Sequence, residues 1–386
     1  MRRSTRVAQC VAACGVAVGA GFLGTSATAA ASSGSPSSVT VVASHLGNPR
    51  GLSFGDDGKL YVAEAGRGNG NHCVSDPEMG SVCVGQNGAI DAIGADGTVT
   101  PVVTGLISVA GPDGSGAEGM VAVSASGGTV YGQFGGNTFG IPTSGLPTFL
   151  QQNAHRELGQ FGMASGAAFA NGAGVGDYDY IWSNAHKELN PQFPDSNPNG
   201  VLVTGGRRFV VDAGANTLDE VRPDGTVDVL TYFDVPAGSP TDAVPTCVAK
   251  GPDGALYVGE LLGGDFAPGH ARVWRVDVSG AKATKSVWAR GLTTVQGCGF
   301  DPAGNFYATE FQINGLGEGP TSDPTGALVK IAPDGSRSNL GVGSLFVPSG
   351  FAAGPDGSLY VSNCSIAPPR GFGPCRDGGA VVKVTS

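Results

Sequence analysis

Short stretches of alternating apolar and polar residues recur along the whole chain, and tight-turn signals separate them. Clear examples are LSFGDDGKLYVAE (52–64), VAKGPDGALYVGE (248–260) and FAAGPDGSLYVSN (351–363). Alternation with a period of two is typical of strands with one buried face, and a D-G pair between two such runs predicts a β-hairpin. The chain is therefore expected to consist mainly of short antiparallel strands.

The hairpin pattern occurs six times, which indicates an internal repeat. Its aligned aromatic residues are separated by 48 to 78 residues, and they are Tyr61, Tyr131, Phe209, Tyr257, Tyr307 and Tyr360. Most copies continue into a second alternating pair, at 88–106, 216–233 and 271–292. Each unit is thus a four-stranded sheet that must stack on its neighbours to bury both faces. We predict an all-β fold, a six-bladed β-propeller of four-stranded blades.

The two ends of the repeat region predict how the ring closes. The last copy ends at 378–386 in a third strand, and no fourth strand follows it. The segment SVTVVASHL (38–46) is similar to the outer strands of other copies, so the N-terminal strand is expected to pair with the last blade. One helix is predicted at 181–190, before Pro191, between blades two and three. The boundaries of those two blades stay open.

Residues 1–31 have the pattern of a signal peptide. Arg2, Arg3 and Arg6 precede an apolar stretch at 7–23, and small residues follow near Ala29. A transmembrane anchor is the weaker interpretation, because the stretch is short and rich in glycine. We expect a secreted, extracellular protein with a short linker at 32–38 and the propeller at 39–386.

Composition narrows the possible partners. Glycine occupies 66 of 386 positions, as expected for many tight turns. The net charge is −10, so no basic surface is expected for nucleic acid or anionic lipid. No other long apolar segment predicts a membrane span. A monomer that binds a small molecule, a glycan or a protein is the expected form.

Six cysteines remain after the signal segment, and an even number in an exported chain suggests disulfides. Short spacing favours Cys73–Cys83 and Cys364–Cys375. Cys247 and Cys298 are then left, and the repeat alignment places them on neighbouring inner strands. A zinc site is the competing interpretation, but no C-x-x-C or H-x-x-x-H pair is present.

Three segments resemble the ScyD/ScyE family of secreted propellers, related to the NHL-repeat and streptogramin-lyase-like group. They are NPRGLSF (48–54), DSNPNG (195–200) and FVVDAGANTLDEVRPDG (209–225). The usual family form of the middle segment is DSNPYG, so Asn199 departs from it. The resemblance covers about 39–386 and implies the fold and export rather than a reaction or a set of catalytic residues.

Propeller geometry places the start of each first strand and the end of each second strand on one face, around the channel. We predict ligand-binding residues there, namely Arg50, Glu64, Glu118, Asn199, Asp212, Glu260, Gln296, Glu310 and Asn363. Four of the second strands end in carboxylates that are candidate ligands for Ca²⁺ or Mg²⁺, which are Glu64, Asp212, Glu260 and Glu310. The competing interpretation is that each acid only caps its own turn.

Two functions fit these features. The first is a secreted protein that binds a small polar ligand, a glycan or a protein at this face. The second is a metal-dependent hydrolase or lyase, resembling gluconolactonases or streptogramin lyases, in which a cation polarises a carbonyl or lactone. Its metal ligands or base would come from Glu64, Glu118, Asn199, Asp212, Glu260 and Glu310. No histidine lies in the ring to act as a general base, so binding is the preferred prediction.

Overall fold

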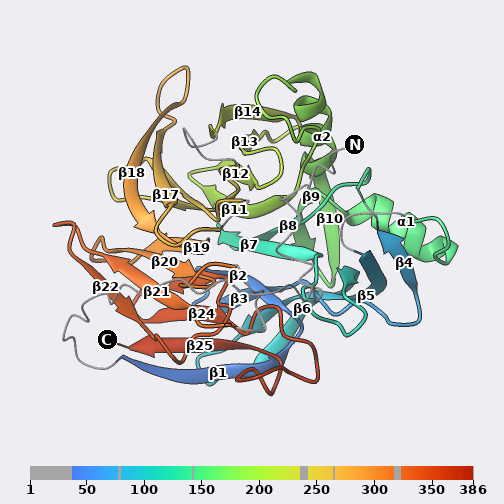
Figure 1. The fold of residues 1–386 in the computed structure, drawn as a ribbon, viewed down its shortest axis with the longest axis horizontal. Helices are drawn as coiled ribbons and strands as arrows, with labels where there is room; N and C mark the ends of the chain where they lie inside the picture. Colours follow the sequence, from blue (N-terminus) through green and yellow to red (C-terminus); the bar gives the residue numbers. More distant parts are fainter. Residues whose placement is uncertain are drawn as a thin grey trace, which may run out of the picture.

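The computed structural model describes residues 37–76, 80–140, 143–234, 242–263, 266–316 and 323–385. Six antiparallel sheets surround a central axis, and two short helices lie beside them (Figure 1). The protein is a six-bladed β-propeller, as the repeat predicts. The predicted signal peptide and most of the predicted linker lie outside the described residues.

Each blade has four strands in order from the channel outward. The innermost strands are β2 (Pro49–Phe54), β7 (Met120–Ser126), β11 (Pro198–Thr204), β15 (Pro245–Lys250), β19 (Val295–Phe300) and β23 (Phe351–Ala353). The second strands are β3 (Leu60–Glu64), β8 (Thr129–Phe134), β12 (Arg207–Asp212), β16 (Leu256–Glu260), β20 (Phe306–Glu310) and β24 (Leu359–Asn363).

The outer half of each blade completes the sheet. The third strands are β5 (Gly80–Ile93), β9 (Gln160–Ser165), β13 (Thr217–Val221), β17 (Ala271–Asp277), β21 (Ala327–Ile331) and β25 (Gly379–Thr385). The outermost strands are β6 (Val99–Ala110), β10 (Ala168–Gly174), β14 (Val227–Tyr232), β18 (Thr284–Leu292), β22 (Arg337–Leu340) and β1 (Ser38–Leu46). Strand β4 (Cys73–Asp76) is added to blade one and pairs with β5.

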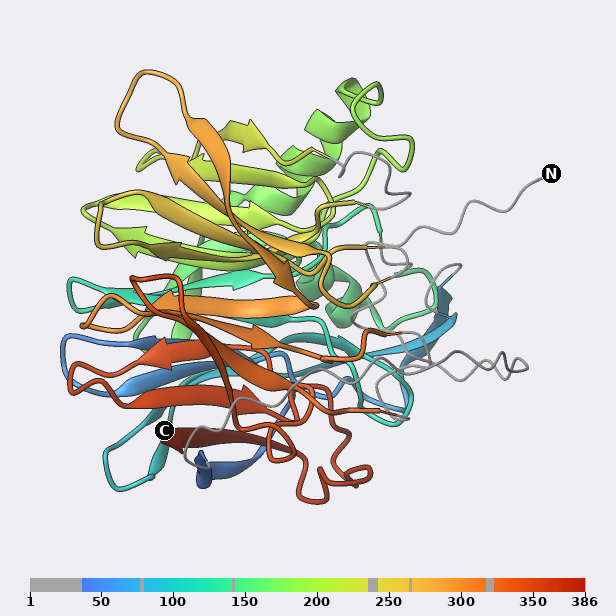
Figure 2. The same ribbon diagram turned by 60° about the vertical axis from the view of Figure 1, so that its left-hand side comes forward.

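The ring closes as predicted. Strand β1 pairs with β25 in antiparallel register, with Val39 opposite Val384 and Val41 opposite Val382, and the two strands lie side by side in Figures 1 and 2. Each innermost strand also contacts the innermost strands of both neighbouring blades, and β23 contacts β2. The last blade is therefore built from both ends of the described chain.

Glycines allow the innermost strands to approach one another closely. In five blades a glycine follows the polar residue at the start of the first strand, and these glycines are Gly51, Gly119, Gly200, Gly297 and Gly350. A Cβ at Gly350 would lie 2.1 Å from the carbonyl oxygen of Arg50, and one at Gly297 would lie 2.3 Å from that of Ser349. Only glycine fits at these contacts, so the preceding polar residues are held around a narrow channel.

The hydrophobic core lies mainly between neighbouring blades. Tyr257 of blade four packs edge-on against Phe300 of blade five, with ring centroids 4.9 Å apart. Tyr307 of blade five stacks on Phe351 of blade six at 5.2 Å. These tyrosines belong to the six aromatic positions of the repeat, so the repeated aromatic residue joins one blade to the next.

The region between β7 and β11 differs from the prediction. Helix α2 spans Val175–Ala185, so the predicted helix at 181–190 begins and ends too late. Its buried side includes Asp179 and Ser183, and these polar residues hide the apolar periodicity. Helix α1 (Thr148–Glu157) was not predicted, and strands β9 and β10 are rich in Gly and Ala, which weakens their strand signal.

Three disulfides are present, with the favoured pairing. Cys73–Cys83 joins β4 to β5, and Cys364–Cys375 closes a loop after β24. Cys247–Cys298 joins β15 to β19, with a Cα separation of 5.7 Å, so it links blades four and five. Disulfides persist mainly in oxidising compartments, in agreement with the predicted export. In the described part of the chain, no helix is long and apolar enough to cross a membrane.

Candidate functional site

The polar starts of the innermost strands come together at one end of the channel. They line a cavity of about 20 Å³, called here the mouth pocket, formed by Arg50, Ala117, Glu118, Val121, Asn197, Asn199, Gln296 and Ser349. Its polar side chains come from five of the six blades. A second cavity of about 70 Å³ extends down the channel and shares Val121, Asn199, Gln296 and Ser349 with the first. Four of the nine predicted ligand-binding residues therefore lie in one pocket.

Local irregularities of the strands turn these side chains inward. The pairing of β2 with β3 shifts register between Pro49 and Leu52, around Arg50. The same shift surrounds Asn199 in β11 and Gln296 in β19. A β-bulge leaves a residue unpaired and redirects its side chain, which is common beside functional sites. At Arg50, Asn199 and Gln296, the bulge and the glycine that follows position the polar residue at the channel.

Arg50 and Glu118 are the charged groups of the mouth pocket. Nη2 of Arg50 donates to the carbonyl oxygen of Ala117 at 2.8 Å. Burial lowers the pKa of Arg50 to about 10, partly offset by the negative charge of Glu118. Burial raises the pKa of Glu118, against the opposing effects of Arg50 and of the Asn197 amide. Arg50 thus stays charged at neutral pH, while burial favours the neutral form of Glu118.

Like Ser349, Asn197 lines the mouth pocket but was not among the predicted ligand-binding residues. Its Nδ2 donates to Oε1 of Glu118 at 3.2 Å, and its Oδ1 accepts the backbone N–H of Gly136 at 2.9 Å. It lies two positions before Asn199, a spacing that places two side chains on the same side of an extended chain. This two-residue spacing from Asn199 was the feature of the sequence that could have identified Asn197 as a pocket residue.

Several of the predicted second-strand residues are engaged by the connection that enters their own blade. The carboxylate of Glu64 accepts the backbone N–H of Gly47, and that of Glu310 accepts the N–H of Thr293 at 2.7 Å. Oδ1 of Asn363 likewise accepts the N–H of Phe346 at 2.7 Å. Each side chain thus fastens the connection that leads into an innermost strand, rather than capping its own turn.

Two of these carboxylates also have raised pKa values. Burial, and then the hydrogen bond with Asp91, raise the pKa of Glu64 to about 8. Burial raises the pKa of Glu310 to about 7. Both groups therefore take up protons near neutral pH, although neither lines the mouth pocket.

Asp212 is fully buried at the end of β12 and accepts four hydrogen bonds. The donors are the backbone N–H groups of Asn197 (2.7 Å), Gly214 (2.9 Å) and Ala215 (2.8 Å), and the hydroxyl of Ser196 (2.6 Å). Asp212 thus holds the backbone of Asn197, whose side chain enters the pocket. Its role is to position the pocket rather than to line it.

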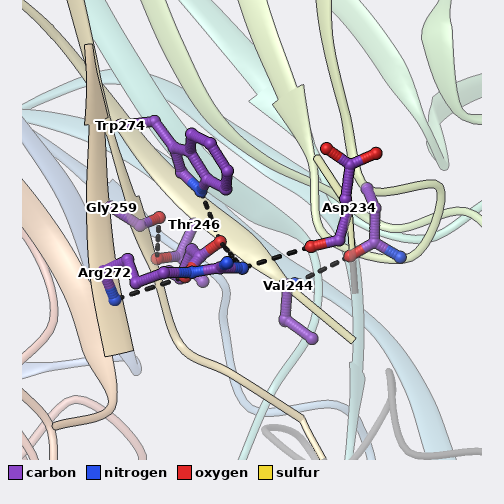
Figure 3. Close-up of polar contacts among 8 residues, drawn as sticks. Asp234, Val244, Thr246, Gly259, Arg272 and Trp274 are labelled. Atoms are coloured by element: carbon purple, nitrogen blue, oxygen red, sulfur yellow. Dashed lines mark hydrogen bonds and ion pairs between the residues drawn. The ribbon is translucent and has the colours of Figure 1, made fainter. Parts of the chain in front are cut away.

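Glu260 forms a buried ion pair. Its oxygens accept Nε of Arg272 at 2.7 Å and Nη2 at 2.8 Å, and the indole N–H of Trp274 also donates to it. Figure 3 shows Arg272 extending beneath the ring of Trp274 toward the backbone of Asp234, whose carbonyl oxygen it also reaches. Thr246, near the start of β15 in blade four, donates to the carbonyl oxygen of Val295 at 2.7 Å and lines the channel cavity.

The predicted metal ligands are thus held by protein donors. Glu64, Asp212, Glu260 and Glu310 each accept hydrogen bonds from their own surroundings, and none lines either channel cavity. Within the described ranges, no group of three or more His, Cys, Asp or Glu side chains could hold a metal ion. These four residues do not fit a shared cation, and Ca²⁺ or Mg²⁺ stays a prediction.

A cluster of three buried aspartates lies next to the pocket-positioning network. Asp179 of α2, Asp212 of β12 and Asp219 of β13 have no exposed surface. Oδ2 of Asp219 accepts the hydroxyl of Thr217 at 2.9 Å, but neither oxygen of Asp179 has a hydrogen-bond donor. Burial, and then the charge of the neighbouring aspartates, raise the pKa of Asp179 well above its usual range. The sequence prediction included Asp212 but neither Asp179 nor Asp219.

The other end of the channel opens differently. The first hairpin turns of blades one, four, five and six surround a wide depression of about 610 Å³, lined among others by Phe54, Lys250, Phe300 and Pro355. The polar mouth pocket and this wider depression therefore occupy opposite ends of the innermost strands.

Comparison with known proteins supports the fold. No protein-family model matches this sequence, and no curated protein matches it. A structural-genomics protein of unknown function from Bacteroides thetaiotaomicron is similar in structure, with a TM-score of 0.54, 11% identity, and coverage of 90% of this chain and 76% of that chain. A gluconolactonase from Xanthomonas campestris has a TM-score of 0.51, 11% identity and coverage of 90% and 89%. A streptogramin B lyase matches with a TM-score of 0.46, 11% identity and coverage of 90% and 97%.

At these identities the likeness concerns the fold alone. The six sheets define the chain as a six-bladed β-propeller, and the neighbours with TM-scores above 0.5 support that fold. Membership of the ScyD/ScyE family stays a prediction.

Proposed function

We propose that this protein is an exported binding propeller that holds a polar ligand at the mouth pocket. The observation that carries the proposal is the convergence of Arg50, Glu118, Asn197, Gln296 and Ser349 from five blades on one small cavity. Concave sites in which a few polar groups converge are the usual form of ligand sites. The ligand is a small polar molecule, a glycan or a protein segment, and one of its polar groups enters the pocket.

The rigidity of the site supports binding. The bulges and close glycine contacts fix the backbone of the innermost strands, and the network from Asp212 to Asn197 fixes the side of the pocket nearest blade three. A preorganised site loses little conformational entropy when a ligand binds. The propeller thus presents its polar groups in place before the ligand arrives.

The test is a binding screen of small polar compounds and glycans against the purified protein and two matched variants. Asn199→Ala changes the mouth pocket, and Lys250→Ala changes the depression at the opposite end of the channel. We expect Asn199→Ala to weaken binding and Lys250→Ala to leave it unchanged. Equal loss in both variants, or loss only in Lys250→Ala, would contradict binding at the mouth.

A metal-dependent lactonase or lyase is the second candidate. It is favoured by the position of Glu118 beside the amide groups of Asn197 and Asn199, since carboxylate and amide oxygens suit hard divalent cations. The test measures bound metal and lactone hydrolysis, with EDTA and after Ca²⁺ or Mg²⁺ is restored. Stoichiometric metal with chelator-sensitive turnover would favour the enzyme. Absence of both would leave binding as the function.

A further inference from the structure

Two hydrogen-bond donors in the mouth pocket have no acceptor among the described residues. Nε of Arg50 and Nε2 of Gln296 are buried, and both lack a hydrogen-bond partner. The two residues are 6% and 5% exposed and line the same cavity. Buried donors are nearly always paired, because leaving one unpaired forfeits its hydrogen bond to water without a replacement. Two residues that line the pocket thus each carry a buried donor for which the described chain supplies no acceptor.

The charge of the pocket restricts that ligand further. Arg50 stays ionised at neutral pH. Among the described residues, no ion pair of 4.0 Å or less joins its guanidinium to the carboxylate of Glu118. The carboxyl of Glu118 is held by the Asn197 amide, and burial favours its neutral form. An unpaired buried guanidinium is costly, and an anionic oxygen relieves that cost where a neutral carbonyl does not.

Size and shape favour one kind of anion. The cavity of about 20 Å³ admits only one small group. A carboxylate is flat, carries one charge and matches the planar fork of a guanidinium. A phosphate is larger and carries up to two negative charges, whereas Arg50 supplies one positive charge.

We propose that the mouth pocket takes the carboxylate of a small organic acid, with Arg50 and Gln296 donating to its oxygens. This inference rests on the proposed function, because it names the ligand class of the same pocket. The remainder of the acid lies outside the cavity, above the ends of the innermost strands. Asn197 and Glu118 orient the pocket without pairing the charge of Arg50.

The test titrates the protein with acetate and with acetamide, which has nearly the same shape and no charge. Binding is followed by chemical shifts and by the melting temperature. We expect acetate to bind and acetamide to bind at least about tenfold more weakly, because hydrogen bonds to charged groups contribute about 1.5–3 kcal/mol. Arg50→Gln and Gln296→Leu should each weaken acetate binding about tenfold or more.

Arg207→Gln is the matched control, since this arginine pairs with Glu220 on blade three, outside the mouth pocket. It should bind acetate like the wild type. If Arg50→Gln does not fold, Gln296→Leu and the acetamide comparison still decide the question.

The outcomes separate the two proposals. Equal binding of acetate and acetamide, lost in Gln296→Leu, would overturn the carboxylate class and leave a neutral polar site at the mouth. Acetate binding that neither variant weakens would overturn the assignment to Arg50 and Gln296. A screen in which some ligand binds but no mouth variant affects it would overturn the proposed function as well.

Discussion

Replacing Asp179 by Asn should change how the stability of this protein depends on pH. Asp179 has no exposed surface, and Asp219 and Asp212 are within hydrogen-bonding reach of it. Two ionised carboxylates cannot hydrogen-bond each other, so a proton on Asp179 is what turns this contact into a hydrogen bond. Burial raises the pKa of Asp219 well above its usual range as well. The native cluster therefore holds a proton that the unfolded chain releases above about pH 4.

The sign of the effect follows from proton linkage. A carboxyl whose folded pKa is raised contributes its full stability below its unfolded pKa and loses it as the pH rises toward the folded pKa. One extra proton in the native state lowers the free energy of unfolding by about 1.4 kcal/mol per pH unit. The cluster thus lowers the free energy of unfolding of the wild type as the pH rises, for as long as the native state keeps this proton.

Asp179→Asn removes the part of this dependence that Asp179 contributes, because the amide donates to its neighbours without taking up a proton, whereas burial still raises the pKa of Asp219. The free energy of unfolding of the variant, minus that of the wild type, should therefore increase with pH above about pH 5, by up to about 1.4 kcal/mol per pH unit. Urea unfolding at several pH values, with the disulfides intact, measures this difference. Contributions from Glu64 and Glu310 are present in both proteins and cancel.

Asp277→Asn is the control, because this carboxylate is exposed and its pKa is lowered by hydrogen bonds from Ser279. The Asp277 carboxylate is ionised above pH 5 in both the folded and the unfolded chain. The free energy of unfolding of Asp277→Asn minus that of the wild type should therefore stay constant between pH 5 and 7. The same constant difference for Asp179→Asn would refute the reasoning, because it would mean that Asp179 itself holds no proton that the unfolded chain releases.

Three further changes test other contacts. Gly350→Ala places a Cβ 2.1 Å from the carbonyl oxygen of Arg50 and should lower the free energy of unfolding, measured with urea, by about 1–3 kcal/mol. An unchanged urea midpoint would contradict the close approach of the two strands. Arg272→Leu leaves Glu260 buried without its charge partner and should lower the free energy of unfolding by about 3–5 kcal/mol. Adding Glu260→Gln to this variant should restore part of the lost stability, and no restoration would argue against the ion pair. For Glu310→Gln, the free energy of unfolding of the variant minus that of the wild type should increase by about 1.4 kcal/mol per pH unit up to about pH 7 and stay constant above it. An increase that continues well beyond pH 7 would contradict the assigned pKa of Glu310.

The sequence alone determined the architecture and the ring closure. Alternating strands, D-G turns and the repeated aromatic residue predict four-stranded units, and the unit count together with SVTVVASHL predicts the closing strand. These features are local or repeat at regular intervals, so they can be recognised in the sequence without knowledge of the tertiary structure. The pairing of Cys247 with Cys298 followed for the same reason, since the repeat places equivalent positions on neighbouring strands.

Only the tertiary structure decided which polar residues meet. The sequence places Arg50 and Glu64 at the same end of one hairpin, yet the bulge turns Arg50 into the channel, while Glu64 binds the backbone of Gly47. A bulge shifts the two-residue alternation by one position, so strand periodicity does not determine where the side chain points. Asp179 and Asp219 meet because α2 packs beside blade three, a contact between segments 40 residues apart that no local pattern encodes.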